Sequence, residues 1–120
     1  MVKREDSELI KYFDWVTWQE KIDPRLAAIY HVANERKCSQ YAGKIMKRKG
    51  VRSGVPDVCG PIPNSKYHGF YFELKIKPNK LSPKQVTFCA LLYRLGYCVR
   101  VAWSGDELIE LTKKYLKGKI

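Results

Sequence analysis

Three short segments decide the fold: Gly54-Val55-Pro56-Asp57, Phe72-Glu73-Leu74-Lys75 and Ser82-Pro83-Lys84-Gln85. The first places an acid after a turn, the second an acid and a lysine two positions apart, and the third the start of a helix. Carboxylates are hard oxygen ligands of the kind that Mg²⁺ takes, beside water and substrate phosphate. A bound metal can activate water, and a lysine offsets negative charge in a transition state. The pattern favours a nuclease.

The middle segment has the alternation of a β-strand between positions 69 and 76. Its apolar face consists of Phe70, Phe72, Leu74 and Ile76. Glu73 and Lys75 share the opposite face with Tyr71, and the two charged residues lie roughly 7 Å apart along the strand. The sequence therefore predicts a functional face on one side of this strand and a core face on the other.

Two further strands and a helix are predicted around this strand. Short strands are expected at Val55–Cys59 and at 97–103, the latter buried and rich in β-forming residues. Ser82 and Gln85 form a predicted capping box with Pro83 at the first helical position, and the helix ends at Gly96. Its inward side chains are expected to be Phe88, Cys89, Leu91, Leu92 and Leu95.

Three other helices complete the predicted fold. One spans 5–20, with Leu9, Ile10, Phe13, Val16 and Trp18 at helical spacing. A second helix is capped by Ser39 and runs through Lys49, and its inner face is expected to consist of Tyr41, Ala42, Ile45 and Met46. The last follows a second capping box at 104–107. Asp23 and Pro24 begin a segment that is either a short helix running into a strand or a helix alone. This order predicts an α/β fold with a small mixed β-sheet flanked by helices.

The length and composition indicate one folded domain over residues 1–120. The chain is 45% hydrophobic, lacks an apolar run long enough for a membrane span, and begins without the apolar core of a signal peptide. We therefore expect a cytoplasmic protein with no membrane partner. Its four cysteines (Cys38, Cys59, Cys89 and Cys98) form no C-x-x-C pair, so reduced thiols are expected rather than zinc ligands or disulfides.

The formal charge of +11 and the pI of about 9.6 indicate a polyanionic partner. Nucleic acid is the most frequent such partner, since each phosphate neutralised releases counterions. The basic residues flank both acids: Lys44, Lys47, Arg48, Lys49 and Arg52 precede Asp57, and Lys75, Lys77, Lys80 and Lys84 surround Glu73. The charges therefore favour phosphate contacts near the predicted site, although a basic run is often only a solvated helix face.

The ordered motifs resemble the VRR-NUC family, a branch of the PD-(D/E)XK nuclease superfamily. The matching residues are His31-Val32-Ala33-Asn34-Glu35-Arg36-Lys37, Gly54–Val58, Tyr67-His68-Gly69, Tyr71–Lys75, Leu81–Gln85 and Leu95-Gly96-Tyr97, with Ala33 and Glu35 departing from the usual pattern. Short strings such as E-x-K occur by chance, whereas the ordered set over nearly the whole chain is specific. The resemblance implies a restriction-endonuclease-like core.

The resemblance also implies roles for individual residues. Asp57 and Glu73 would bind Mg²⁺ or Mn²⁺, with the backbone carbonyl of Leu74 as a further ligand, and Lys75 would position or activate water. The first helix would add a carboxylate, and of Glu5 and Glu8, which both fit, Glu8 is preferred because it precedes Leu9 and Ile10. Gln85 has a complete structural role in the capping box and is also a motif residue near the site. Asn34 and Arg36 are predicted to contact DNA, together with Lys44, Lys47, Arg48, Arg52, Lys77 and Lys80.

Small standalone phage and bacterial members of the family resemble Holliday-junction resolvases. The resemblance thus implies a metal-dependent endonuclease that cuts branched DNA as a homodimer, without a small-molecule cofactor, in a bacterial or phage-infected cell. A non-catalytic basic nucleic-acid-binding module and a less selective nuclease are the alternatives. In the first alternative Asp57 would be only a turn residue and Glu73 a solvated strand charge. Trp15, Trp18 and Trp103 are expected in the core, and His31 receives no catalytic role.

Overall fold

The computed structural model describes residues 3–33 and 39–120. Its elements are α1 (Arg4–Gln19), the 3-10 helix η1 (Pro24–Ala28), β1 (Tyr30–His31), α2 (Gln40–Arg48), β2 (Val58–Gly60), β3 (Phe70–Leu74), α3 (Pro83–Arg94), β4 (Cys98–Ala102) and α4 (Gly105–Leu116). The strands form one mixed sheet in the order β1-β2-β3-β4, antiparallel except for the parallel pair β3–β4. The α/β prediction is confirmed.

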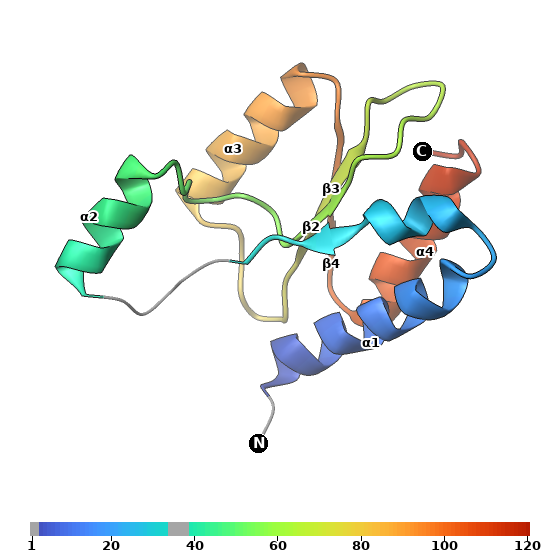
Figure 1. Ribbon diagram of the computed structural model, residues 1–120, viewed down its shortest axis with the longest axis horizontal. Coiled ribbons are helices and arrows are strands. Elements are labelled where there is room, and N and C mark those ends of the chain that lie inside the picture. The colour runs from blue at the N-terminus through green and yellow to red at the C-terminus, as the bar shows by residue number, and fades with distance from the viewer. Residues whose placement is uncertain (1–2, 34–38) are drawn as a thin grey trace.

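Helices cover both faces of the sheet. Figure 1 shows α1 and α4 side by side on one face and α3 on the other, with α2 standing apart from this body. The core lies between the sheet and the α1–α4 layer, where Phe70 and Phe72 are fully buried. Two tyrosines bury their rings there and keep their hydroxyls paired: Tyr12 with Thr112 Oγ1 at 2.9 Å, and Tyr115 with the Ile62 carbonyl at 2.7 Å.

Three local predictions are confirmed, and one open alternative is resolved. The Ser82–Gln85 capping box is complete, Ser39 caps α2, and Gly96 follows the end of α3 with φ of 98°. Such a positive φ favours glycine, because a Cβ would be strained there. Asp23 caps η1, which leads directly into β1, so the segment is a short helix followed by a strand.

Several burial predictions are wrong. In α1, Tyr12 and Val16 are buried, whereas Ile10 and Trp18 are exposed, Trp18 by 68%. In α3 only Leu92 is buried, and Leu91 and Leu95 are exposed. No α2 side chain is buried, Tyr41 is 76% exposed, and Trp103 lies at the surface. In α1 and α3, apolar residues lie on more than one face and packing buries only one of them, whereas α2 stands apart from the rest of the fold (Figure 1).

Three further features differ from the predictions. β2 begins at Val58 instead of Val55, because Pro56 has no N–H for a strand ladder. β4 was predicted to be a buried strand, but only its end residues Cys98 and Ala102 are buried, and the residues between them are half-buried. At the start of α4, Ser104 accepts from the Glu107 amide as predicted, but the Glu107 carboxylate accepts from the amide of Trp103 rather than that of Ser104. The second capping box is therefore only half formed.

Cys59, Cys89 and Cys98 are free thiols, while Cys38 lies outside the described residues. Across 3–33 and 39–120, no helix combines the length and the apolar character that crossing a membrane requires.

Candidate active site

Asp57 and Glu73 lie opposite each other on neighbouring strands. The antiparallel register pairs Val58 with Phe72, so Asp57, one residue before β2, falls opposite Glu73 near the end of β3. Both are almost completely buried, with exposed fractions of 5% and 4%. Burying an acid without a compensating charge costs free energy of folding. A buried pair of acids is therefore a candidate functional site.

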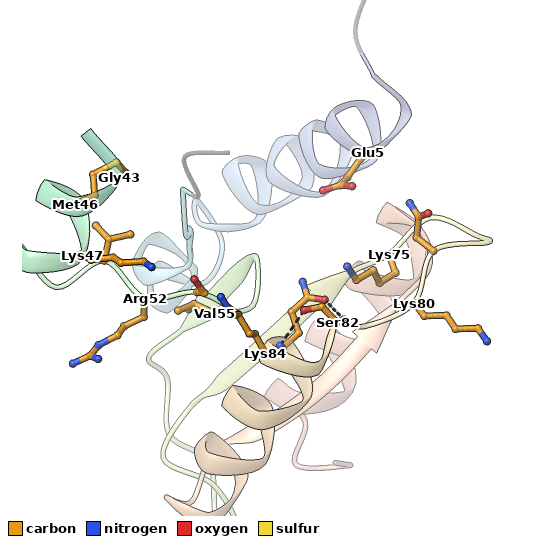
Figure 2. A pocket seen from close by; sticks show the side chains of 15 residues that line it. Glu5, Gly43, Met46, Lys47, Arg52, Val55, Lys75, Lys80, Ser82 and Lys84 are labelled. Carbon is orange, nitrogen blue, oxygen red and sulfur yellow. Dashed lines mark hydrogen bonds between the residues drawn. The ribbon is translucent and has the colours of Figure 1, made fainter. Parts of the chain in front are cut away.

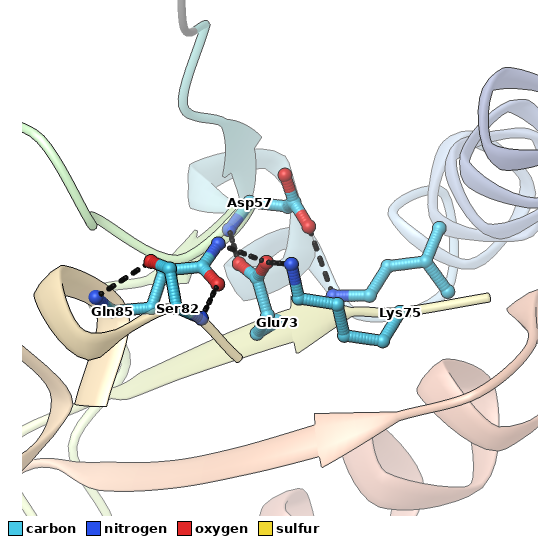
Figure 3. Close-up of polar contacts among 6 residues, drawn as sticks. Asp57, Glu73, Lys75, Ser82 and Gln85 are labelled. Carbon is cyan, nitrogen blue, oxygen red and sulfur yellow. Dashed lines mark hydrogen bonds and ion pairs between the residues drawn. The ribbon is translucent and has the colours of Figure 1, made fainter. Parts of the chain in front are cut away.

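Hydrogen bonds fix both carboxyl groups (Figure 3). Asp57 Oδ2 accepts from the Leu74 amide at 2.9 Å, and Glu73 Oε1 accepts from the Asp57 amide at 3.2 Å. The two acids therefore position each other through the backbone of the opposite strand. This arrangement brings together the acids of two of the three motifs.

The third motif joins the same network through Gln85. Its Nε2 donates to Glu73 Oε2 at 2.8 Å, while its Oε1 accepts from the Ser82 amide at 2.8 Å. The side chain of Gln85 thus closes the capping box and also contacts Glu73. Lys75 approaches from β3, with Nζ 3.5 Å from Glu73 Oε2. A lysine and an amide therefore share one carboxylate oxygen.

Burial raises the pKa of both acids, and a neighbouring negative charge adds to this rise at each of them. Burial, followed by the charge of Asp57, raises the pKa of Glu73 to about 7, and the Lys75 ammonium opposes that rise. Burial also raises the pKa of Asp57; the Leu74 hydrogen bond counteracts this effect and the charge of Glu5 adds to it. A positive charge bound between the carboxylates would relieve both effects.

The free energy of unfolding should therefore depend on pH through Glu73. Because its folded pKa exceeds the ordinary value of 4.5, its contribution is complete below pH 4.5 and is lost as the pH rises through about 7. Without divalent cations, urea unfolding of the wild type should show this decline, and Glu73→Gln should flatten it. Glu110→Gln, at an exposed position on α4, is the control. Equal slopes in the wild type and Glu73→Gln would contradict the prediction.

An open pocket of about 610 Å³ adjoins this network (Figure 2). Lys75 and Gln85, which both contact Glu73, line it together with Gly54 and Val55 from the turn before Asp57. Gly54, with φ of 86°, packs so closely on α3 that a Cβ would lie 2.5 Å from the Lys84 carbonyl oxygen. The turn before Asp57 is thereby held against the start of α3.

The pocket wall is strongly basic. The cations that line it are Lys47, Arg52, Lys75, Lys80 and Lys84, and Glu5 is the one acid among its lining residues within the described part of the chain. Of the residues predicted to contact DNA, Lys47, Arg52 and Lys80 therefore lie at the pocket. Lys44 and Arg48 are exposed on α2, and Lys77 lies over the Trp103 ring at 5.9 Å. Asn34 and Arg36 lie outside the described residues.

The structure corrects the preference for Glu8 as the carboxylate of the first helix. Glu8 Oε1 accepts from the Gly105 amide at 2.8 Å and so caps the start of α4. Glu5, one turn earlier, lines the pocket opposite Lys75 (Figure 2). The charge of Glu5 raises the pKa of Asp57. Glu5 is therefore the acid of α1 at the site.

His31 also belongs to the site, although its sequence context gave it no role. Its Nδ1 lies 2.8 Å from the Asp57 carbonyl oxygen, which also accepts from the Val32 amide at 2.7 Å. A carbonyl only accepts hydrogen bonds, so Nδ1 carries the proton. The sequence feature that could have indicated this contact is the position of His31 in the His31–Lys37 motif.

The VRR-NUC domain family matches residues 5–105, which include every motif at the site. The chain belongs to the VRR-NUC family. VRR-NUC domains are nuclease domains, and the buried acids, the lysine and the basic pocket agree with that class. A solved structure described as a VRR_NUC domain protein has a TM-score of 0.76 and 28% sequence identity, and the match covers 98% of this chain and 91% of that one. No curated protein matches the sequence.

This VRR-NUC site has a donor set suited to a hard cation rather than to zinc. Within the described residues, no three His, Cys, Asp or Glu side chains are grouped to hold a metal. Asp57 and Glu73 supply two oxygen-donor groups whose charge is not fully balanced by Lys75, and Mg²⁺ commonly takes only one or two carboxylates from protein. The buried pair therefore fits Mg²⁺ or Mn²⁺.

Proposed function

We propose that the protein is a Mg²⁺- or Mn²⁺-dependent endonuclease that hydrolyses DNA phosphodiesters, preferentially at branched structures such as Holliday junctions. The observation that carries this proposal is the juxtaposition of two buried acids with Lys75 beside a basic pocket. Asp57 and Glu73, with the Leu74 carbonyl, would hold the cation, and Glu5 would support them from the pocket wall. When bound, the cation supplies Lewis acidity that lowers the pKa of water and offsets charge on phosphoryl oxygens.

The other side chains of this site have separate roles in the proposed reaction. Lys75 places a positive charge beside Glu73, where it orients water and stabilises negative charge on the phosphate as the bond to the leaving oxygen breaks. Gln85 holds Glu73 in place from α3. Lys47, Arg52, Lys80 and Lys84 bind the DNA backbone, which fixes the strand without reading its sequence.

We also propose a homodimer. Symmetric incision of two strands at a junction requires two sites, which a two-fold axis supplies.

A substrate panel tests this function. Four-way junction, flap, linear duplex and single-stranded DNA are each incubated with Mg²⁺, Mn²⁺ or EDTA, and products are resolved on denaturing gels. We expect cleavage only when a divalent cation is present, and the fastest cleavage on the junction. Light scattering should give the mass of a dimer. Equal rates on all four substrates would favour the less selective nuclease. Binding without cleavage in either metal would favour the non-catalytic module.

The assignment of Glu5 gives a prediction for metal affinity. Glu5→Gln should weaken Mn²⁺ binding by roughly 10-fold, within the range for groups that support metal ligands. Calorimetric titration measures this directly without DNA. Glu8→Gln is the matched control one turn away and should bind Mn²⁺ like the wild type, because Glu8 caps α4 instead. Weakened binding in Glu8→Gln alone would restore Glu8 as the supporting acid.

A further inference from the structure

The sheet face that carries the two acids continues as a row of tyrosines. Tyr30 on β1 pairs with Cys59 on β2, which pairs with Tyr71 on β3. Side chains directly opposite each other on antiparallel strands lie on the same face. The three side chains thus cross the sheet in one row, and the pKa of each phenol is raised in part by the neighbouring Cys59 thiol.

This row lies next to the acids. Cys59 is two residues after Asp57, and Tyr71 is two residues before Glu73, so all four side chains belong to one face. The spacing along each strand is roughly 7 Å. Tyr30 lies one strand beyond Cys59, about 5 Å further across the sheet. A nucleotide next to a phosphate at the acids would therefore lie within reach of Tyr30.

Tyr30 offers the accessible ring of this row. It lies on the edge strand β1 and is 52% exposed, whereas Tyr71 is half-buried and packs edge-on against Tyr97 with ring centroids 5.3 Å apart. Cys59 is buried between the two phenols. Tyr30 is thus a flat aromatic group supported on one side and open to solvent.

We propose that Tyr30 stacks on an unpaired nucleobase adjacent to the scissile phosphate. The inference rests on the proposed nuclease function and specifies its substrate: branched DNA in which a nucleotide beside the cut is unpaired in the complex. A base inside a duplex already stacks on its neighbours, whereas a base at a branch point is free to stack on an aromatic side chain.

The position of Tyr30 favours a nucleobase over a second protein. The basic pocket adjoins the same acids, so one strand would place its phosphates in the pocket and a base on the ring. A stable protein interface buries about 800 Å² on each partner, far more than one exposed ring supplies. Continuity with the acids and the adjoining positive charge therefore both select a nucleotide.

The experiment combines protein and substrate changes on one branched DNA. Wild type, Tyr30→Ala and Tyr30→Phe are compared on intact DNA and on DNA with an abasic position on either side of the cut. Tyr30→Ala should lower kcat/KM by about 10-fold, as expected for loss of one stacked base, and Tyr30→Phe should not. An abasic site at one of the two positions should lower the kcat/KM of the wild type by the same factor as Tyr30→Ala does on intact DNA. The same abasic site should not lower the kcat/KM of Tyr30→Ala any further. Trp18→Ala, at an exposed aromatic on α1, is the control.

A binding readout separates this inference from the nuclease proposal. 2-Aminopurine is placed at each branch-point position in turn, and at one of them it should lose fluorescence on binding to the wild type and not to Tyr30→Ala. That result, with no cleavage by the wild type, would support the stacking site and overturn only the nuclease. Unchanged cleavage by Tyr30→Ala, or losses that multiply with the abasic change, would overturn the stacking site. Conversion of a dimer to a monomer by Tyr30→Ala, with unchanged quenching, would make Tyr30 an interface residue instead.

Discussion

Asp57→Asn is expected to slow DNA cleavage by about 10³-fold or more, equivalent to roughly 4 kcal/mol of transition-state stabilisation, while DNA binding is retained. The substitution removes the charge of a proposed metal ligand but keeps an oxygen that can accept from the Leu74 amide. The cations that we propose bind DNA are other residues, which line the pocket. Single-turnover cleavage and fluorescence anisotropy measure the two properties separately.

The same variant has a second signature. Because Asp57 and Glu73 repel each other when both are charged, Asp57→Asn should raise the melting temperature in EDTA. Asp106→Asn, on the exposed start of α4, is the control and should cleave like the wild type. Full activity of Asp57→Asn would contradict the proposed site, and a wild type that is itself inactive in both metals would favour the non-catalytic module.

Phe70→Ala is expected to lower the free energy of unfolding by about 3–5 kcal/mol. Phe70 is fully buried; its ring stacks on Phe72 with centroids 4.3 Å apart and meets Tyr115 edge-on at 4.9 Å. Removing the ring leaves a cavity at the centre of the core, and the loss is a large share of the roughly 5–15 kcal/mol that stabilises a domain. Urea denaturation monitored by circular dichroism gives the value.

Trp18→Ala provides the comparison for that measurement. Trp18 is mostly exposed, so its removal should change the free energy of unfolding by only about 0.5 kcal/mol. Similar losses in the two variants would show that Phe70 is not the centre of the core.

The strand that carries the site was predictable because its signal is local. Alternation from Phe70 to Leu74 assigned the buried face, and two acids at fixed positions relative to predicted strands were expected to converge. The Ser82–Gln85 capping box was equally local, since both partners lie within four residues. The pairing of Gln85 with Glu73 required the tertiary structure, because these residues belong to different elements.

The choice between Glu5 and Glu8 was not local. Both acids lie on the first turns of α1, and the rotation of this helix about its axis decides which one faces the pocket. That rotation is fixed by packing on α4, where Glu8 meets Gly105 and Tyr12 meets Thr112. Helical spacing could not reveal these partners, which follow about 100 residues later. The same packing leaves Ile10 and Trp18 at the surface.

The amide group of Gln85 joins two parts of the molecule that are usually considered separately. One end closes the first turn of α3, and the other holds Glu73. A shift in the position or ionisation of this acid is therefore transmitted to the helix through a single side chain. Under the proposed function, hydrogen–deuterium exchange in the first turn of α3, which begins ten residues after Glu73 along the chain, would report cation occupancy without substrate.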